Sequence, residues 1–162
     1  GKEHEIILAE KKKGKVDLGL VGEIVGISTA PITEELHKDK ITVILPMGIG
    51  KDKIVYIVNA DEAAENIAIH LKAEKLVLLT NVKGIMRNPE DQNSFLSTLT
   101  VKEAKGLIHE NVVQKGMIPK VDACIDALDH GVTKTHIIDA RIPHALLLEI
   151  FTDTGIGTEI IK

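Results

Sequence analysis

The sequence of 162 residues contains few aromatic side chains, with no tryptophan, one tyrosine and two phenylalanines. Proteins that bind single-stranded nucleic acid stack the bases on aromatic side chains, and this chain lacks such a set. Its formal net charge of −4 also lacks the positive excess typical of nucleic-acid-binding surfaces. We therefore expect no nucleic-acid partner.

Cysteine and long apolar runs are also scarce. Cys124 is the only cysteine, which excludes an internal disulfide and a cysteine-rich zinc site. Val121, Ile125 and Leu128 recur around it at helical spacing, so the thiol is expected to be buried and structural. No apolar run reaches the about 18 residues that a membrane helix needs. The polar start at Gly1 does not resemble a secretory signal, and we expect a cytoplasmic protein with no membrane partner.

Apolar runs alternate with helical stripes along most of the chain. Ile41–Leu45 and Lys53–Val58 are predicted to be strands, and Asn59–Ala73 carries apolar residues on one face of a helix. Lys75–Thr80 is apolar on both faces, which is typical of a strand at the centre of a parallel sheet. This alternation predicts an α/β fold with a mainly parallel sheet.

The second half continues the same pattern. Thr100 with Glu103 predicts a capped helix start, and Pro119 favours the first turn of a later helix that Gly131 would end. Further predicted elements are a strand at His136–Ile138, a helix at His144–Phe151 and a strand at Thr158–Ile161. In the first half, Gly14–Ile27 is ambiguous, because its glycines suit a hairpin while a helical period is not excluded.

Two helix starts could carry phosphate chemistry. Asp61 lies in the first turn of the helix after Asn59, where a carboxylate also stabilises the helix without any catalytic role. Before another predicted helix, Gly116 would let the backbone approach an anion and Lys120 would lie in the first turn. An ordinary surface lysine is the alternative interpretation of Lys120.

A lysine and an aspartate at two helix starts are the groups that phosphoryl transfer needs, because that reaction depends on positioning and charge stabilisation. Other enzyme classes lack their motifs here. The sequence contains neither the G-x-x-x-x-G-K-[ST] phosphate loop nor the G-x-S-x-G elbow of hydrolases. The histidines lack a convincing metal-ligand spacing, so no metal site in the protein itself is expected.

Several motifs together resemble the carboxyl-terminal half of the N-acetylglutamate kinases, a family of the amino acid kinase superfamily. The resemblance covers nearly the whole chain and lies in Asp17–Glu23, Val58–Asp61, Leu78–Gly84, Lys115–Val121, His136–Asp139 and Gly155–Thr158. It implies a three-layer αβα sandwich, with residues 1–162 forming the nucleotide-binding domain. It also implies that the amino-terminal domain, which holds most of the acyl-amino-acid pocket, is absent from this chain.

The resemblance further implies an activity, which is phosphorylation of the side-chain carboxylate of N-acetyl-L-glutamate by ATP with Mg²⁺, in arginine biosynthesis. Lys120 would stabilise the transferring phosphoryl group, Asp61 would organise the lysines around it, and Asn59 would contact the substrate. The implied nucleotide contacts are Thr80, Asn81, Val82, Gly84, Gly116, Met117 and Lys120. L-Arginine is the implied inhibitor in feedback-regulated members, at His136, Glu149 and Gly155.

The chain departs from the family at Ile57, where an asparagine usually contacts the substrate's α-carboxylate. Because an isoleucine cannot make that hydrogen bond, two other hypotheses stay open. One is another kinase of the superfamily, and the other is a module that binds ATP or arginine without turnover. The family members are generally oligomers, and a truncated sheet leaves an unpaired edge. We therefore expect a homo-oligomer or a need for a partner chain.

Overall fold

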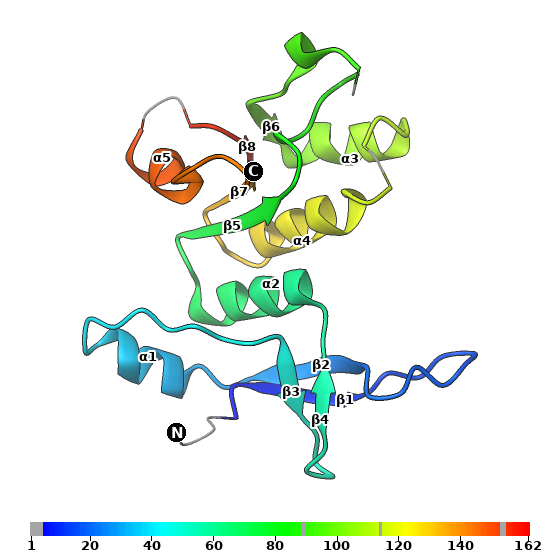
Figure 1. The fold of residues 1–162 in the computed structure, drawn as a ribbon, viewed down its shortest axis with the longest axis vertical. Helices are drawn as coiled ribbons and strands as arrows, with labels where there is room; N and C mark the ends of the chain where they lie inside the picture. Colours follow the sequence, from blue (N-terminus) through cyan, green and yellow to red (C-terminus); the bar gives the residue numbers. More distant parts are fainter. Residues whose placement is uncertain (1–4, 89, 114, 153–154) are drawn as a thin grey trace. The chain divides into compact units, whose positions relative to one another are not determined.

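The computed structural model describes residues 5–88, 90–113, 115–152 and 155–162, and the chain divides into two compact units, residues 1–71 and 72–162 (Figure 1). Each unit has its own four-stranded mixed sheet and its own helices. Among the described residues, no helix is both long enough and apolar enough to span a membrane.

Unit 1 is built on a sheet in the order β2-β1-β3-β4. Its elements are β1 (Ile7–Lys11), β2 (Gly22–Ile27), α1 (Ala30–Leu36), β3 (Met47–Ile49), β4 (Val55–Ile57) and α2 (Ala60–Leu71). The strands β1 and β2 pair antiparallel, which settles the ambiguous glycine-containing segment as a hairpin. Helix α1 is not among the elements predicted from the sequence, although Pro31 near its start is a recognised helix-start signal.

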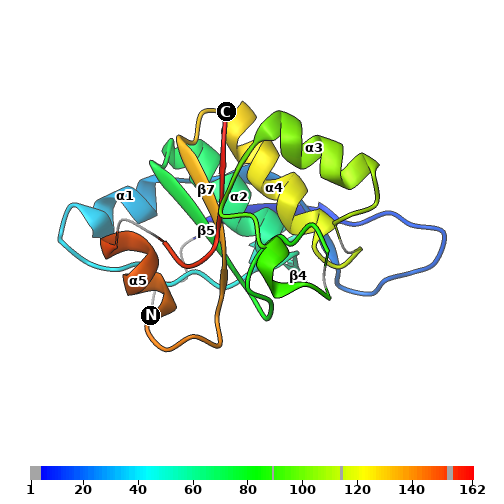
Figure 2. The same cartoon turned by 90° about the horizontal axis from the view of Figure 1, so that it is seen from above.

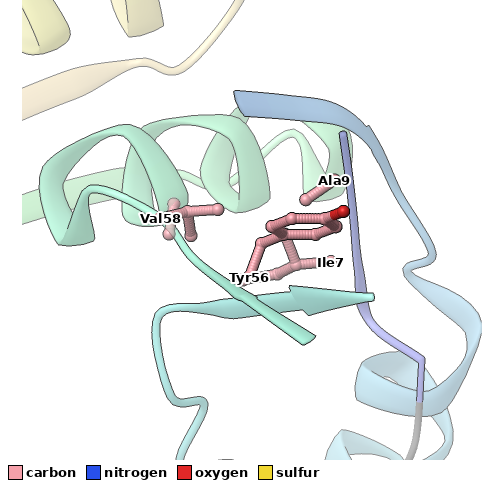
Figure 3. Packing of buried hydrophobic residues seen from close by; sticks show 5 residues of the cluster. Ile7, Ala9, Tyr56 and Val58 are labelled. Carbon is pink, nitrogen blue, oxygen red and sulfur yellow. The ribbon is translucent and has the colours of Figure 1, made fainter. Parts of the chain in front are cut away.

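The core of unit 1 is centred on Tyr56, whose ring lies against Ile7 and Ala9 of β1 (Figure 3). Its hydroxyl leaves the apolar cluster and donates to Asp52 Oδ2 at 2.6 Å. Two glycines permit this packing. A Cβ on Gly22 would lie 2.6 Å from Tyr56 Cβ, and one on Gly48 would lie 2.6 Å from Ala9 Cβ. Neither distance leaves room for a side chain.

The predicted strand at Ile41–Leu45 is wrong. No strand is assigned there, and Ile41, Val43 and Leu45 are 93%, 86% and 62% exposed. The strand that follows, β3, begins only after Pro46 and pairs with β1 and β4. An apolar run becomes a buried strand only where neighbouring strands and helices cover it, and the described part of the chain supplies no strand partner for this run.

Unit 2 has a sheet in the order β5-β7-β8-β6. Its elements are β5 (Lys75–Thr80), a 3₁₀ turn η1 (Gln92–Ser94), β6 (Thr98–Thr100), α3 (Val101–His109), α4 (Ile118–Asp129), β7 (Lys134–Asp139), α5 (Ala145–Phe151) and β8 (Thr158–Ile161). The strands β5 and β7 are parallel, as are β6 and β8, while β7 and β8 are antiparallel. The predicted α/β class is confirmed.

Helices cover both faces of this second sheet. The helices α3 and α4 lie on one side of β5 and β7, and α5 lies on the other (Figure 2). The apolar stripe of α4 is buried, including Cys124, as its helical spacing predicts. The capping box is also confirmed, because Thr100 Oγ1 accepts from the Glu103 amide and the Glu103 carboxylate accepts from the Thr100 amide.

The exposed run at Ile41–Leu45 generates a prediction about association. The run exposes alternate apolar residues and has no strand partner in the described part of the chain. Because such a run favours strand addition, we expect a second copy of the chain to associate at it. Sedimentation velocity should show self-association that Val43→Glu reduces. Val16→Glu, at another exposed apolar position, should leave it unchanged. A wild-type chain that stays monomeric at high concentration would contradict this prediction.

Candidate functional site

The loop that follows β5 contains four of the residues singled out from the sequence. Thr80 ends β5, and Asn81, Val82 and Gly84 follow in a turn. Gly84 has φ +147°, and a Cβ there would lie 2.6 Å from Thr158 Oγ1. The loop after β5 therefore requires glycine at this position, for its backbone angle and for lack of space.

Val82, Gly84 and Met117 come together around one apolar hollow of about 30 Å³ in unit 2. Thr80 lies beside it, since its hydroxyl donates to Met117 Sδ at 3.7 Å. Four other residues line this apolar hollow and were not predicted from the sequence: Ile85, Met86, Val112 and Val113. Their apolar character within otherwise polar loops is the signal that could have identified them. The hollow is small and lined by apolar side chains, so it offers an apolar contact surface and no room for a whole ligand.

The helix α4 begins directly after Met117, which is its N-cap residue without a side-chain capping bond. Pro119 lies in the first turn, and the Lys120 amide donates to the Met117 carbonyl oxygen at 3.0 Å. The helix dipole favours an anion at such an amino end, and the Lys120 side chain adds positive charge. Gly116 precedes this turn, and a Cβ there would meet no atom within 4 Å.

Asn59 and Asp61 belong to unit 1, at the amino end of α2. The Asn59 side-chain oxygen accepts from the Asp61 amide at 2.8 Å and from the Glu62 amide at 3.1 Å. Capping by Asn59 is thus confirmed, and Asp61 lies in the first turn. Cooperation between Asp61 and Lys120 stays a prediction, because the two residues belong to different units.

A second group of predicted site residues lies on the face of the unit 2 sheet that α5 covers. His136 of β7 donates from Nδ1 to Glu149 Oε1 of α5 at 2.5 Å, and both side chains are buried. Glu149 Oε2 accepts from the Ile156 and Gly157 amides at 2.8 and 3.3 Å. Gly155 has φ +57°, and a Cβ there would lie 3.2 Å from the same carboxylate. All three predicted effector residues are therefore brought together.

These residues open onto a charged pocket of about 270 Å³. Lys75, Lys134 and Glu159 also line it and were missed by the sequence analysis. Lys134 Nζ lies 3.2 Å from Glu159 Oε1, and Glu159 is the antiparallel partner of His136. The two-residue spacing of Lys134 and His136 in a strand was the available signal, because it places both on one face. The charged pocket thus contains both carboxylates and ammonium groups.

The two nitrogens of the buried His136 ring have different surroundings. Burial lowers the pKa of His136 below its ordinary value, more than the Glu149 carboxylate raises it. With Nδ1–H donating to Glu149, the other nitrogen Nε2 is buried and has no hydrogen-bond partner among the described residues. Glu159 Oε1 is 3.7 Å from Nε2, too far for a hydrogen bond. The neutral ring therefore leaves an acceptor nitrogen without a protein partner.

In the described ranges, no group of three or more histidine, cysteine, aspartate or glutamate side chains could hold a metal ion. Asp139, which ends β7, is occupied by Arg141, whose guanidinium makes bonds of 2.7 to 3.2 Å to both carboxylate oxygens. This ion pair lowers the pKa of Asp139 and fixes the turn after β7.

Curated relatives match the chain along its whole length. Acetylglutamate kinase from Petrotoga mobilis is 51% identical over 162 residues, which are 100% of this chain and 54% of that protein. Acetylglutamate kinase from Syntrophomonas wolfei is 46% identical, over 100% of this chain and 56% of that protein. The chain therefore spans about half the length of the relatives it matches.

Solved structures show the same architecture. N-acetylglutamate synthase from Neisseria gonorrhoeae, in complex with coenzyme A and L-arginine, is 28% identical with a TM-score of 0.88, over 98% of this chain and 37% of that chain. Carbamate kinase from Giardia lamblia bound to AMP-PNP is 20% identical with a TM-score of 0.67, over 96% and 52%. At that identity, the second likeness concerns the fold alone. The model of the amino acid kinase family matches residues 2–139, and this chain belongs to that family.

Proposed function

We propose that this chain supplies the ATP-binding part of an acetylglutamate kinase. The enzyme would transfer a phosphoryl group from ATP to the side-chain carboxylate of N-acetyl-L-glutamate. The observation that carries the proposal is identity of 46–51% to acetylglutamate kinases over the full length of this chain. The apolar hollow beside the amino end of α4 supports it, because it combines a surface for a flat ring with a site that favours anions.

In this proposal the nucleotide base contacts Val82, Gly84 and Met117 along the apolar hollow. Asn81 lies in the loop between Thr80 and Val82, within reach of polar groups of the nucleotide. The phosphates lie toward Gly116 and Lys120, where the helix dipole and the lysine ammonium both stabilise negative charge. Lys120 would be a catalytic residue, because charge develops on the transferring phosphoryl group.

The residues fit a nucleotide-borne magnesium ion better than a resident metal. Mg²⁺ in phosphoryl-transfer sites is commonly held through substrate phosphates with few protein ligands. Such binding agrees with the described residues, which contain no cluster of metal ligands. The ion would neutralise phosphate charge when bound with ATP.

Turnover would require more than this chain. Asn59 and Asp61 are the proposed contacts in unit 1 for the acceptor and the lysines, while Ile57 cannot donate a hydrogen bond to an acceptor carboxylate. The chain corresponds to about half of its relatives, and we propose that a second domain or partner chain completes the acceptor site. On this basis the isolated chain is expected to bind nucleotide without catalysing transfer, and the complete enzyme to be a homo-oligomer in the cytoplasm.

Nucleotide binding by the chain can be measured directly. The chain should bind Mg-ADP in a calorimetric titration, and Lys120→Ala should weaken binding roughly tenfold, since it removes a charge-assisted contact to phosphate. Lys102→Ala is the matched control, because Lys102 is an exposed lysine on α3 of the same unit. Wild-type chain without binding at millimolar nucleotide, or equal weakening by both variants, would contradict the proposal.

A second function, binding of L-arginine as an effector, is favoured by the charged pocket. Glu149 and Glu159 would attract the guanidinium group, while Lys75 and Lys134 would attract the carboxylate of the amino acid. The Neisseria N-acetylglutamate synthase that resembles this chain was solved with L-arginine. The Glu149 carboxylate is already fixed by His136 and two backbone amides, so it is held in place before a ligand arrives.

Binding of L-arginine to the charged pocket can be tested with variants of Glu149. L-Arginine should bind the wild-type chain, and Glu149→Gln should weaken it by more than about tenfold because the buried charge is lost. Glu110→Gln, at an exposed position just after α3, should bind as wild type does. Arginine binding without any nucleotide binding would favour the non-catalytic module over the kinase part.

The affinity for L-arginine is expected to depend on pH through His136. His136 has a pKa below its ordinary value because it is buried, so it is neutral at pH 7 and becomes protonated only as the pH falls through that lowered pKa. The imidazolium would repel a guanidinium group in the charged pocket. Arginine affinity should therefore stay constant near pH 7 and fall only as the pH drops below the ordinary pKa of histidine, and His136→Gln should show a smaller fall. Equal pH dependence in the two proteins would exclude His136 as the cause.

A further inference from the structure

Thr158 joins the β8 strand to the loop that follows β5. Its hydroxyl accepts from the Ile85 amide at 2.8 Å and donates to the Leu96 carbonyl oxygen at 2.7 Å. The residue is fully buried and pairs with Ile137 of the central strand β7. The Thr158 hydroxyl thus hydrogen-bonds to both ends of the loop, at Ile85 and at Leu96, and holds them to the sheet.

The same hydroxyl touches the turn at Gly84. A Cβ on Gly84 would lie 2.6 Å from Thr158 Oγ1 and 2.9 Å from Phe95 Cε2. The backbone at Gly84 therefore lies directly on Thr158, and the missing side chain leaves the room that the hydroxyl occupies.

Gly84, Ile85 and Met117 all line the apolar hollow. Met117 accepts a hydrogen bond from Thr80 of β5, whereas the Ile85 amide donates to Thr158 of β8. Thr158 itself does not line the apolar hollow. The two chain segments that line the hollow are therefore held to the sheet by separate hydrogen bonds.

We propose that Thr158 is a positioning residue for nucleotide binding, acting through the backbone of Gly84 and Ile85. Ile85 is buried, so loss of the hydroxyl would leave its amide without an acceptor. A buried donor without a partner is costly, and the loop would move to satisfy it. The movement would change the shape of the apolar hollow. This inference rests on the proposed nucleotide site.

Calorimetric titration of the 162-residue chain with Mg-ADP tests the inference. Thr158→Val keeps the shape of the side chain and removes the hydroxyl, and should weaken binding roughly tenfold. Thr158→Ser keeps the hydroxyl and should bind within about twofold of wild type. Thr158→Ala replaces the valine variant if that protein does not fold.

Thr135→Val is the matched control. Thr135 is an equally buried threonine in β7, but its hydroxyl donates to the Ile160 carbonyl oxygen, away from the loop. It should bind Mg-ADP as wild type does, even if its melting temperature falls. Wild-type affinity in Thr158→Val, equal weakening by Val and Ser, or equal weakening by Thr135→Val would overturn the inference. If the wild-type chain shows no Lys120-dependent binding, the proposed nucleotide site fails, and the role of Thr158 fails with it.

Discussion

The parallel pairing of β5 with β7 is the interaction on which unit 2 depends. It runs over six residue pairs, from Lys75 and Lys134 to Thr80 and Asp139. At its carboxyl end β5 leads into the loop beside Met117, and on the face toward α5 the same β7 strand presents His136 to Glu149. Both candidate sites therefore take their geometry from one pair of strands, although they lie in different parts of the unit and differ in chemistry.

The two sites differ in what they offer a ligand. The apolar hollow is small and adjoins the amino end of α4, where the helix dipole favours an anion. The charged pocket is larger and contains carboxylates and ammonium groups a few ångströms apart, which suits a small zwitterion with a second cation. Each site includes a glycine at positive φ, Gly84 in the first and Gly155 in the second, where a Cβ would approach another side chain closely.

Much of the fold was predictable because its signals are local. The continuous apolar run of β5, the Asn59 and Thr100 caps, and Pro119 with Gly131 around α4 each depend on neighbours a few residues away. The segment at Ile41–Leu45 was predicted wrongly because strand formation depends on partners distant in sequence. Its alternation and β-branched residues do not reveal that the described chain provides no strand partner there.

In the candidate sites too, residues in local motifs were predictable, and residues whose contacts are distant in sequence were not. The family resemblance identified Val82, Gly84 and Met117, and the structure brings them together. It did not identify Thr158 as a contact of the loop, because its hydroxyl bonds to residues 73 and 62 positions earlier. Glu159 was missed for a similar reason, since only the pairing of β7 with β8 places it beside His136.

The buried position of Cys124 has a practical consequence. The chain has a single thiol, and it is completely covered at the interior face of α4. A thiol-reactive dye can reach it only when α4 separates from the sheet or when unit 2 unfolds. The labelling rate of the unmodified chain therefore reports how often this layer opens. A ligand that binds at the amino end of α4 would slow the labelling in proportion to its occupancy.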